Sequence, residues 1–168
     1  MNALKELKPT ALKDNPFKLI GSDWMLITAG TPEHFNTMTA SWGGLGVIWD
    51  KEVAFVFVRP TRHTFSFMEQ AAVFTLSFFT EQYRPALDFC GTHSGRDVNK
   101  VAKTGLTATT GEDSGVYFAE ARLVLVCRKL HAQNIDPAGF LDPAISEFYA
   151  QRDYHHFYVG EILRCLAR

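Results

Sequence analysis

The segment Arg59-Pro-Thr-Arg-His-Thr64 carries the densest group of side chains that are suited to binding chemistry. It follows an apolar run and precedes a stretch with helical character, so we expect it at the start of a helix. Helix N-termini present free N–H groups and partial positive charge. Arg59, Arg62 and His63, together with the hydroxyls of Thr61 and Thr64, then form an anion site suited to a phosphate. The alternative, of equal weight, is an N-cap at Thr61 with solvated charges around it.

A second segment, Phe35 to Trp42, alternates apolar and hydroxyl-bearing residues and predicts a strand. Thr37, Thr39 and Ser41 share one face of it, and Asn36, Met38 and Ala40 share the other. Small side chains let a flat ligand approach the backbone, whose N–H and C=O groups can read the edge of a heteroaromatic ring. On pattern alone, an edge strand with threonines chosen for β-propensity is favoured.

Two further segments carry basic or titratable groups. The turn Ser94-Gly-Arg-Asp-Val-Asn-Lys100 could add positive charge to the same ligand, although the residues alone favour a basic surface turn. In the segment from Asp153 to Glu161, the neighbouring His155 and His156 point to opposite faces of a strand and cannot easily share one metal ion. A histidine there can handle protons near neutral pH, or it is a hydrogen-bonded structural residue. The histidines and cysteines have no metal-type spacing, so no metal is expected.

Composition narrows the class of protein. The 168 residues fit one domain, and 46% hydrophobic with 21% charged residues is ordinary for a globular chain. A net charge of −1 gives no electrostatic case for nucleic acid or a membrane surface. The odd count of 3 cysteines points to a reducing compartment. We find no signal peptide and no apolar run of about 18 residues, and therefore expect a soluble, cytoplasmic protein.

The hydrophobic pattern predicts a mainly β fold. Residues 1–20 are polar and basic and are expected to form an N-terminal arm before a domain of residues 21–168. Strands are predicted at 24–29, 35–42, 45–49, 53–58, 73–79, 118–133 and 154–166, with helices at 61–71, 82–89 and within 90–103, and with loops at 107–115 and 137–149. Strands outnumber helices, which favours a closed or partly closed antiparallel barrel. A dinucleotide-type glycine motif and a Walker loop are both absent.

Taken in order, the segments NTMTASW, RPTRHT, SGRDVNK and HHFYVGEI resemble the flavin reductase-like family with an FMN-binding split barrel, and flavoredoxin-type members most of all. The resemblance runs from about Trp24 to Leu163. It implies a six-stranded antiparallel Greek-key split β-barrel with short peripheral helices. It also implies a homodimer with one flavin per subunit near the interface.

The resemblance also implies roles for individual residues. The cofactor-binding set is Asn36, Thr37, Met38, Thr39, Ala40, Ser41 and Trp42 along the isoalloxazine ring, Arg59, Thr61, His63 and Thr64 around the phosphate, and Lys100 reaching the flavin. His155 matches the histidine on the nicotinamide side and is the candidate catalytic residue. One departure is that Tyr154 separates this histidine from Asp153, whereas flavin reductases place an acid directly before it.

The expected function is that of an FMN-binding oxidoreductase, with FMN favoured over FAD and with NADH or NADPH as electron donor. The chain would reduce FMN, or a small acceptor through bound FMN. The first alternative is an FMN-binding electron carrier that a redox partner protein reduces, which the position of Tyr154 favours slightly. Others are a pyridoxamine-phosphate-oxidase-like barrel, whose phosphate the segment 59–64 can also hold, and a barrel that binds no flavin.

Overall fold

Strands rich in β-branched and aromatic residues make up most of the fold, as the alternating pattern predicts. The computed structural model describes residues 3–111 and 113–168. Within them, one sheet of eight strands contains β1 (Lys5–Leu7), β2 (Met25–Gly30), β3 (Phe35–Ala40), β4 (Gly43–Ile48), β5 (Lys51–Val58), β6 (Val73–Phe78), β9 (Leu123–Asn134) and β10 (His156–Ala167). A separate pair joins β7 (Ala108–Thr110) to β8 (Val116–Phe118).

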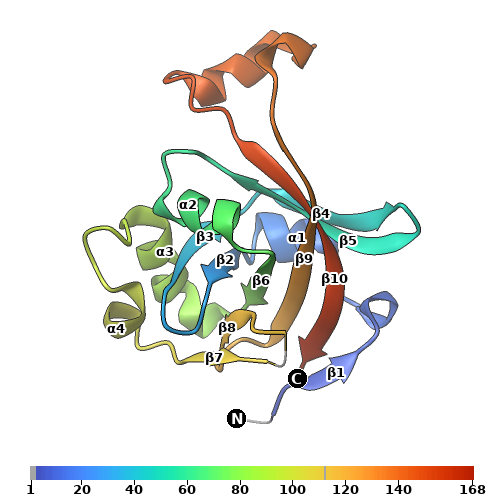
Figure 1. The fold of residues 1–168 in the computed structure, drawn as a ribbon, viewed down its shortest axis with the longest axis vertical. Helices are drawn as coiled ribbons and strands as arrows, with labels where there is room; N and C mark the ends of the chain where they lie inside the picture. Colours follow the sequence, from blue (N-terminus) through green and yellow to red (C-terminus); the bar gives the residue numbers. More distant parts are fainter. Residues whose placement is uncertain (1–2, 112) are drawn as a thin grey trace.

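The order of the large sheet is β3-β2-β6-β9-β10-β5-β4, and every neighbouring pair is antiparallel. β3 and β4 lie at the two ends of this order although they follow each other along the chain. The sheet is strongly curved (Figure 1). No ladder joins β3 to β4 among the described residues, so hydrogen bonds do not close the sheet. The predicted mainly β, antiparallel fold is confirmed.

The bent strand β10 pairs with three other strands of the sheet. Its first half pairs with β5 and its last residues pair with β1, while β9 runs along its other edge. The β10–β9 register shifts at Val159/Gly160 and again between Ile162 and Arg164, and such bulges bend a strand. A Cβ on Gly160 would lie 2.5 Å from the ring of Phe74, so only glycine fits at the first bend.

Helical segments are short and lie around the sheet (Figure 1). They are η1 (Pro9–Ala11), α1 (Pro16–Gly21), α2 (His63–Gln70), η2 (Glu81–Tyr83), α3 (Arg84–Thr92), α4 (Lys100–Thr104), η3 (Pro137–Gly139) and η4 (Pro143–Tyr149). Asn15 caps α1 by accepting hydrogen bonds from Phe17 and Lys18, and Asn99 caps α4 by accepting from Ala102.

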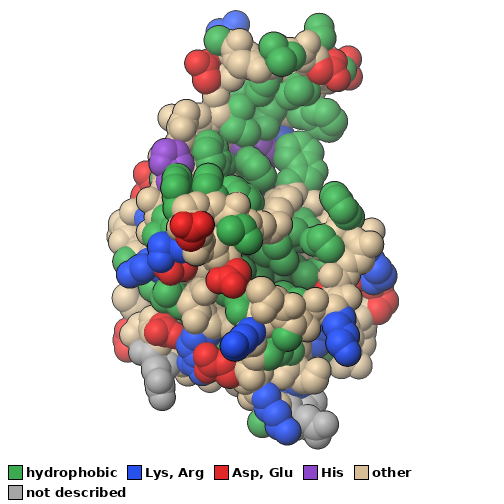
Figure 2. All heavy atoms as spheres, turned by 90° about the vertical axis from the view of Figure 1, so that its right-hand side faces the viewer, with side chains coloured by type: hydrophobic (Ala, Val, Ile, Leu, Met, Phe, Trp, Pro, Cys, Tyr) green, Lys and Arg blue, Asp and Glu red, His purple; other side chains and the backbone are tan. Residues whose placement is uncertain are grey.

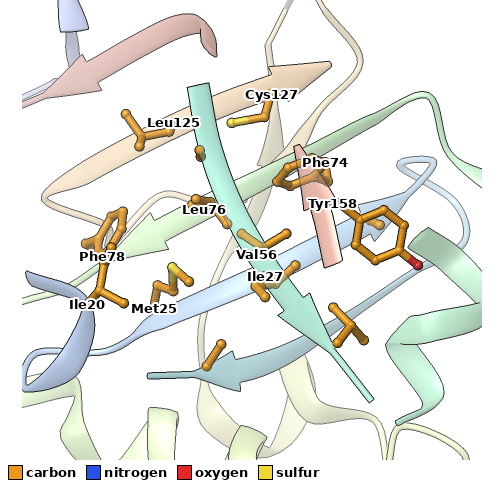
Figure 3. Close-up of a cluster of buried hydrophobic side chains, with 14 of the residues drawn as sticks. Ile20, Met25, Ile27, Val56, Phe74, Leu76, Phe78, Leu125, Cys127 and Tyr158 are labelled. Atoms are coloured by element: carbon orange, nitrogen blue, oxygen red, sulfur yellow. The ribbon is translucent and has the colours of Figure 1, made fainter. Parts of the chain in front are cut away.

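Two hydrophobic clusters fill the two faces of the sheet. Figure 3 shows side chains of the larger cluster meeting between strands, among them Ile27, Val56, Phe74 and Tyr158. The second cluster packs beneath α3 and the β7–β8 pair, around Phe118. Because apolar side chains cover both faces, β2 reads as a nearly continuous buried run rather than an alternating one.

A segment of residues 135–155, carrying η3 and η4, projects from the sheet between β9 and β10; we call it the projecting segment (Figure 1). Ile135 N donates to His155 O over 2.9 Å, which closes its base. Figure 2 shows hydrophobic side chains gathered where this segment meets the body of the molecule. Among the exposed apolar residues are Leu141 and Phe148 of the segment and Trp42 of the body.

All seven predicted strands have a counterpart in the large sheet, with some corrections. The predicted N-cap at Thr61 is wrong: Arg62 is the N-cap of α2, and no side chain caps it. The predicted strand 118–133 is divided between β8 and β9, and the predicted loop 107–115 contains β7. Within residues 1–20, β1 pairs with the end of β10, and Leu19 and Ile20 are buried in the larger cluster.

Candidate functional site

The predicted flavin strip on β3 is held rigidly by its own side chains. The hydroxyl of Thr37 meets that of Thr28 at 2.9 Å, and Thr39 Oγ1 donates to Leu87 O at 2.5 Å. On the other face, Met38 and Ala40 are buried in the larger cluster. Among the described residues, β3 pairs with β2 alone, and its last residues lead into Ser41 and Trp42 beyond the strand end. The backbone along this edge is therefore the part available to a ligand.

Lys100 supports the strip from beneath. Its side chain is buried, and Nζ donates to the carbonyls of Thr37 and Cys90, both at 2.8 Å. Burial lowers the pKa of Lys100 to about 8, with Cys90 opposing and Arg62 adding to the shift. The lysine thus ties β3 to α3 and places a titratable positive charge behind the strip.

Asn36 connects the strip to α2. Its Nδ2 donates to the fully buried hydroxyl of Thr64 at 2.8 Å. A Cβ on Gly95 would lie 2.0 Å from Asn36 Oδ1, so the loop before α4 can approach this closely only with glycine. Thr64 therefore serves this contact, and its hydroxyl is engaged inside the protein.

A cavity of about 160 Å³ lies at the start of α2; we call it the basic cavity. It is lined by residues 61–64, 91–95 and Lys100. Arg62 donates to Cys90 O at 3.4 Å, and Arg96 donates to Thr61 O at 3.4 Å. Neither arginine, nor Lys100, takes part in any ion pair between described residues.

The pKa values of two groups in the basic cavity are lowered, first by burial and then by the neighbouring cations. Burial and then Arg59 lower the pKa of Arg62, while burial followed by Arg96 and Lys100 lowers the pKa of His63. A cation is disfavoured where other cations are close. The basic cavity is therefore a place where an anion would relieve electrostatic repulsion.

A second cavity, of about 190 Å³, lies beside the first; we call it the aromatic cavity. Residues 38–42, Phe57, Arg59, Arg62 and His155 line it. The ring of Trp42 lies 5.2 Å from that of His155, and Phe57 lies 6.3 Å from it. Because Arg62 lines both cavities, they form the two ends of one site.

Arg59 belongs to the aromatic end. Its guanidinium donates to Asp153 Oδ1 at 2.7 Å and to Phe148 O at 2.8 Å, and lies over the ring of Tyr149. The bond to Arg59 lowers the pKa of Asp153, so this pair is charged and mutually compensated at neutral pH. Arg59 is thus engaged with the projecting segment, away from the basic cavity where sequence reasoning expected it.

His155 is 8% exposed, and its Nδ1 lies 2.9 Å from the hydroxyl of Tyr149. Burial, and then Arg59, lower the pKa of His155 to about 4, against the opposing effect of Asp153. At neutral pH this imidazole is uncharged.

The predicted site residues fall into connected groups. Met38, Thr39, Ala40, Ser41, Trp42, Arg59 and His155 line the aromatic cavity, and Thr61, His63, Thr64 and Lys100 line the basic cavity. Asn36 and Thr37 line a larger neighbouring cavity of about 550 Å³, which shares His63, Gly95 and Lys100 with the basic one.

Sequence reasoning missed Phe57 and Tyr149 and gave no special place to Gly95. Phe57 sits in an ordinary strand pattern, and Tyr149 lies in a loop of no recognisable motif, so neither carried a signal. The glycine in the turn before Lys100 was a signal, since an isolated loop glycine often marks close backbone approach.

Among the described residues, no group of three or more His, Cys, Asp or Glu side chains is placed to hold a metal ion. No helix in the described part of the chain has the length and apolar character needed to cross a bilayer.

The fold recurs in solved structures of other proteins. Flavoredoxin from Methanosarcina acetivorans matches with a TM-score of 0.67 at 21% identity, over 87% of this chain and 68% of that one. An FMN-binding domain of a flavin reductase-like enzyme from Shewanella baltica matches with 0.70 at 18% identity, over 99% and 78%. An NADH:FAD oxidoreductase from Streptomyces globisporus matches with 0.65 at 16% identity, over 85% and 73%.

No curated protein matches the sequence. The family model described as "Flavin reductase like domain" does match, over residues 17–168. These residues include the whole site and every strand of the sheet except β1. The fold is therefore a split β-barrel, and the chain belongs to the flavin reductase-like family.

Proposed function

We propose that the protein binds FMN across the basic and aromatic cavities and acts as an oxidoreductase that accepts electrons from NADH or NADPH. Family membership supports flavin-related redox chemistry. The observation that carries the proposal is the asymmetry of two cavities that share Arg62: cations without ion pairs gather at one, and aromatic rings beside the compensated Arg59 line the other.

The basic cavity fits a phosphate. A phosphate monoester brings a charge of about −1.5 to −2 and three acceptor oxygens. Arg62 supplies donors, Thr61 and Ser94 supply hydroxyls, and Lys100 supplies charge from below. Arg96 does not line the cavity, but it donates to Thr61 O and so adds positive charge beside it. The first N–H groups of α2 open at the same place. We assign the phosphate to Arg62 rather than Arg59, because Asp153 already compensates Arg59.

The aromatic cavity fits a flat ring system. Ala40 and Ser41 are small, so a planar ligand can lie close to the backbone at the end of β3. Trp42 and Phe57 provide ring surface on the other sides. Each cavity alone is smaller than the ~300–1,000 Å³ of typical small-molecule sites, and the two together fall within that range. This agrees with one ligand that spans both.

Bound FMN would supply the hydride and electron chemistry, and the chain would supply orientation and environment. Arg62 and its neighbours would anchor the phosphate, and the β3 edge would fix the ring plane. Trp42 and Phe57 would exclude water from one side. The uncharged His155 would offer a hydrogen bond to the substrate that approaches the ring.

We also propose that two copies associate over the aromatic end. Trp42 is 42% exposed and Phe148 57% exposed at the edge of this cavity, and their rings lie 5.5 Å apart. Apolar surface of this kind beside a small-molecule site favours burial by a second wall. Light scattering should give twice the monomer mass; a monomer that retains FMN would contradict the dimer.

An electron carrier without nicotinamide activity is the second candidate. The observation in its favour is that Asp153 is bound to Arg59 and separated from His155 by Tyr154, so the usual acid next to the histidine is missing. A carrier would keep the flavin and expose its edge to a redox partner protein. The exposed ring of Trp42 suits such contact equally well.

An anaerobic titration separates these functions. The purified chain is loaded with FMN, freed of excess ligand, and mixed with NADH or NADPH while flavin absorbance is followed. Bleaching faster than that of free FMN supports the reductase. Retained flavin that neither nucleotide bleaches supports the carrier, and failure to retain FMN or FAD at all overturns the flavin assignment.

A further inference from the structure

Tyr149 and His155 form a buried contact that the binding of a flavin does not require. Tyr149 is 6% exposed and His155 is 8% exposed. The hydroxyl of Tyr149 lies 2.9 Å from Nδ1 of His155. The two residues come from the end of η4 and from just before β10, so the contact also connects the projecting segment to its base.

The hydrogen in this contact belongs to Tyr149. Burial raises the pKa of the phenol, so it keeps its proton, and no other hydrogen bond of the hydroxyl exists among the described residues. If His155 donated instead, the phenolic hydrogen would be left without an acceptor at a buried site, which is costly. Tyr149 therefore donates and Nδ1 accepts. A neutral imidazole that accepts at Nδ1 carries its hydrogen on Nε2.

Burial, and after it the charge of Arg59, lowers the pKa of His155 and keeps the ring uncharged. Arg59 approaches from the end of β5, Asp153 lies in the projecting segment, and the nearest rings are those of Trp42 and Tyr149, followed by Phe57. Arg59 opposes protonation, and its ion pair with Asp153 diverts the one carboxylate that would favour it. The stack of Tyr149 on Phe140, at 5.8 Å between ring centres, holds the phenol in place.

The other ring nitrogen opens to the aromatic cavity. His155 lines that cavity, and Nε2 has no hydrogen-bond partner among the described residues. Nε2 is also absent from the buried side-chain atoms that lack a partner, so the exposed part of this ring includes it. An N–H group that faces a cavity without a partner is a donor ready for a ligand.

We propose that Tyr149 is a positioning residue that fixes His155 as a neutral Nε2–H donor, so that His155 recognises an uncharged carbonyl or carboxamide oxygen and does not act as an acid. This rests on the proposed function only for the identity of the ligand. The tautomer and charge of His155 follow from the protein alone. The substrate class that fits is a planar molecule with a neutral carbonyl group, held over the aromatic cavity.

The first test reads the unaltered chain and uses a variant only to assign the signals. The full chain is labelled with ¹⁵N in its histidine rings, and His155 is assigned by loss of its signals in His155→Gln. We expect an unprotonated Nδ1 and a protonated Nε2, unchanged from pH 8 down to pH 5. A protonated Nδ1, or an imidazolium signal at pH 6, would overturn the proposal whether or not the chain binds a flavin.

Tyr149→Phe removes only the hydroxyl and keeps the ring beneath Arg59. We expect a mixture of the two tautomers and a higher pKa for His155, because the bond donated to Nδ1 favours the neutral form. Tyr154→Phe is the matched control, since that ring lies 5.1 Å from Tyr149 and its hydroxyl makes no hydrogen bond among the described residues. If both variants give the same His155 ring ¹⁵N signals as the unaltered chain, Tyr149 does not set the tautomer.

The ligand is tested separately in the FMN-loaded protein with NADH, whose carboxamide carries the carbonyl. His155→Gln keeps a neutral N–H donor, and His155→Phe removes it. We expect the KM for NADH to rise by about three- to tenfold in His155→Phe and to change less in His155→Gln, as for one neutral hydrogen bond. Equal loss in both variants would overturn the donor role, while failure to load FMN would count against the proposed function alone.

Discussion

The two ends of the site treat their positive charges in opposite ways. At the basic cavity, Arg62, Arg96 and Lys100 donate only to backbone carbonyls, and no carboxylate pairs with them among the described residues. At the aromatic cavity, Arg59 is neutralised by Asp153 at 2.7 Å. Carbonyls orient a cation without cancelling its charge. Most of the charge that remains lies where a phosphate would bind, and the aromatic end keeps only that of Arg62, which lines both cavities.

The two ends also differ in what holds them. The basic cavity is built from α2, α3 and the loop before α4, all of which pack on the sheet. Two lining residues of the aromatic cavity are held by the projecting segment. Arg59 donates to Phe148 O, and His155 contacts the hydroxyl of Tyr149. Anchoring therefore depends on the body, and recognition of a substrate depends on a segment that extends from it.

The largest expected effect is at the basic end. Arg62→Ala removes a charge-assisted donor, worth about 1.5–3 kcal/mol, so FMN affinity should fall by about ten- to a hundredfold. Fluorescence titration measures it. Riboflavin is the matched ligand control, because it lacks the phosphate and its affinity should change little. An equal loss for both ligands would place Arg62 at the ring and not at the phosphate.

The assignment of the phosphate to Arg62 shows which parts of the site could be predicted from the sequence and which could not. From its residue types, the segment 59–64 was predicted to be either an anion site or a helix cap with solvated charges, and its residues 61–64 line the basic cavity. Which arginine faces that cavity depends on Asp153, which lies 94 positions away in sequence from Arg59. No local pattern encodes such a pairing. The strands could be predicted because their hydrophobic pattern is local. The role of Tyr149 could not be predicted, because its contact with His155 forms only when the end of η4 packs against the residue before β10.

A second prediction tests the rigidity of the basic end. Gly95→Ala would place a Cβ 2.0 Å from Asn36 Oδ1, displacing the side chain that bonds Thr64. We expect a loss of about 1–3 kcal/mol in the free energy of unfolding, as for overpacking. Chemical denaturation measures it. Gly91→Ala is the control: its Cβ meets Thr39 at 3.4 Å in ordinary contact, so its unfolding should be nearly unchanged.

If Gly95→Ala unfolds like the unaltered chain, the loop before α4 moves freely and the basic cavity is not preformed. The affinities of Gly95→Ala for FMN and for riboflavin then show whether the basic end or the aromatic end is affected. A rigid basic end predicts that Gly95→Ala weakens FMN more than riboflavin, because the displaced loop carries Ser94 and Arg96.

A third, smaller effect concerns pH. Lys100 loses its proton above its pKa of about 8, which removes one positive charge from the basic end. FMN affinity should therefore be nearly constant between about pH 7 and 7.5, where the phosphate is mostly dianionic, and fall by up to about fivefold between about pH 8 and 9.5, the scale of a partly screened ion pair. Bound phosphate favours protonated Lys100 and moves the fall to higher pH. Riboflavin affinity should stay flat over the same range.

The smallest effect on affinity is expected at Arg59. Arg59→Ala removes the ion pair with Asp153 and the bond to Phe148 O, but leaves Arg62 and the basic cavity intact. We expect FMN affinity to change by less than about threefold, because the contacts that are lost lie outside the basic cavity. Hydrogen exchange of the projecting segment should rise, since one of its connections to the body is lost. A tenfold or greater loss of FMN affinity with unchanged exchange would return the phosphate to Arg59 and remove the contrast between the two ends.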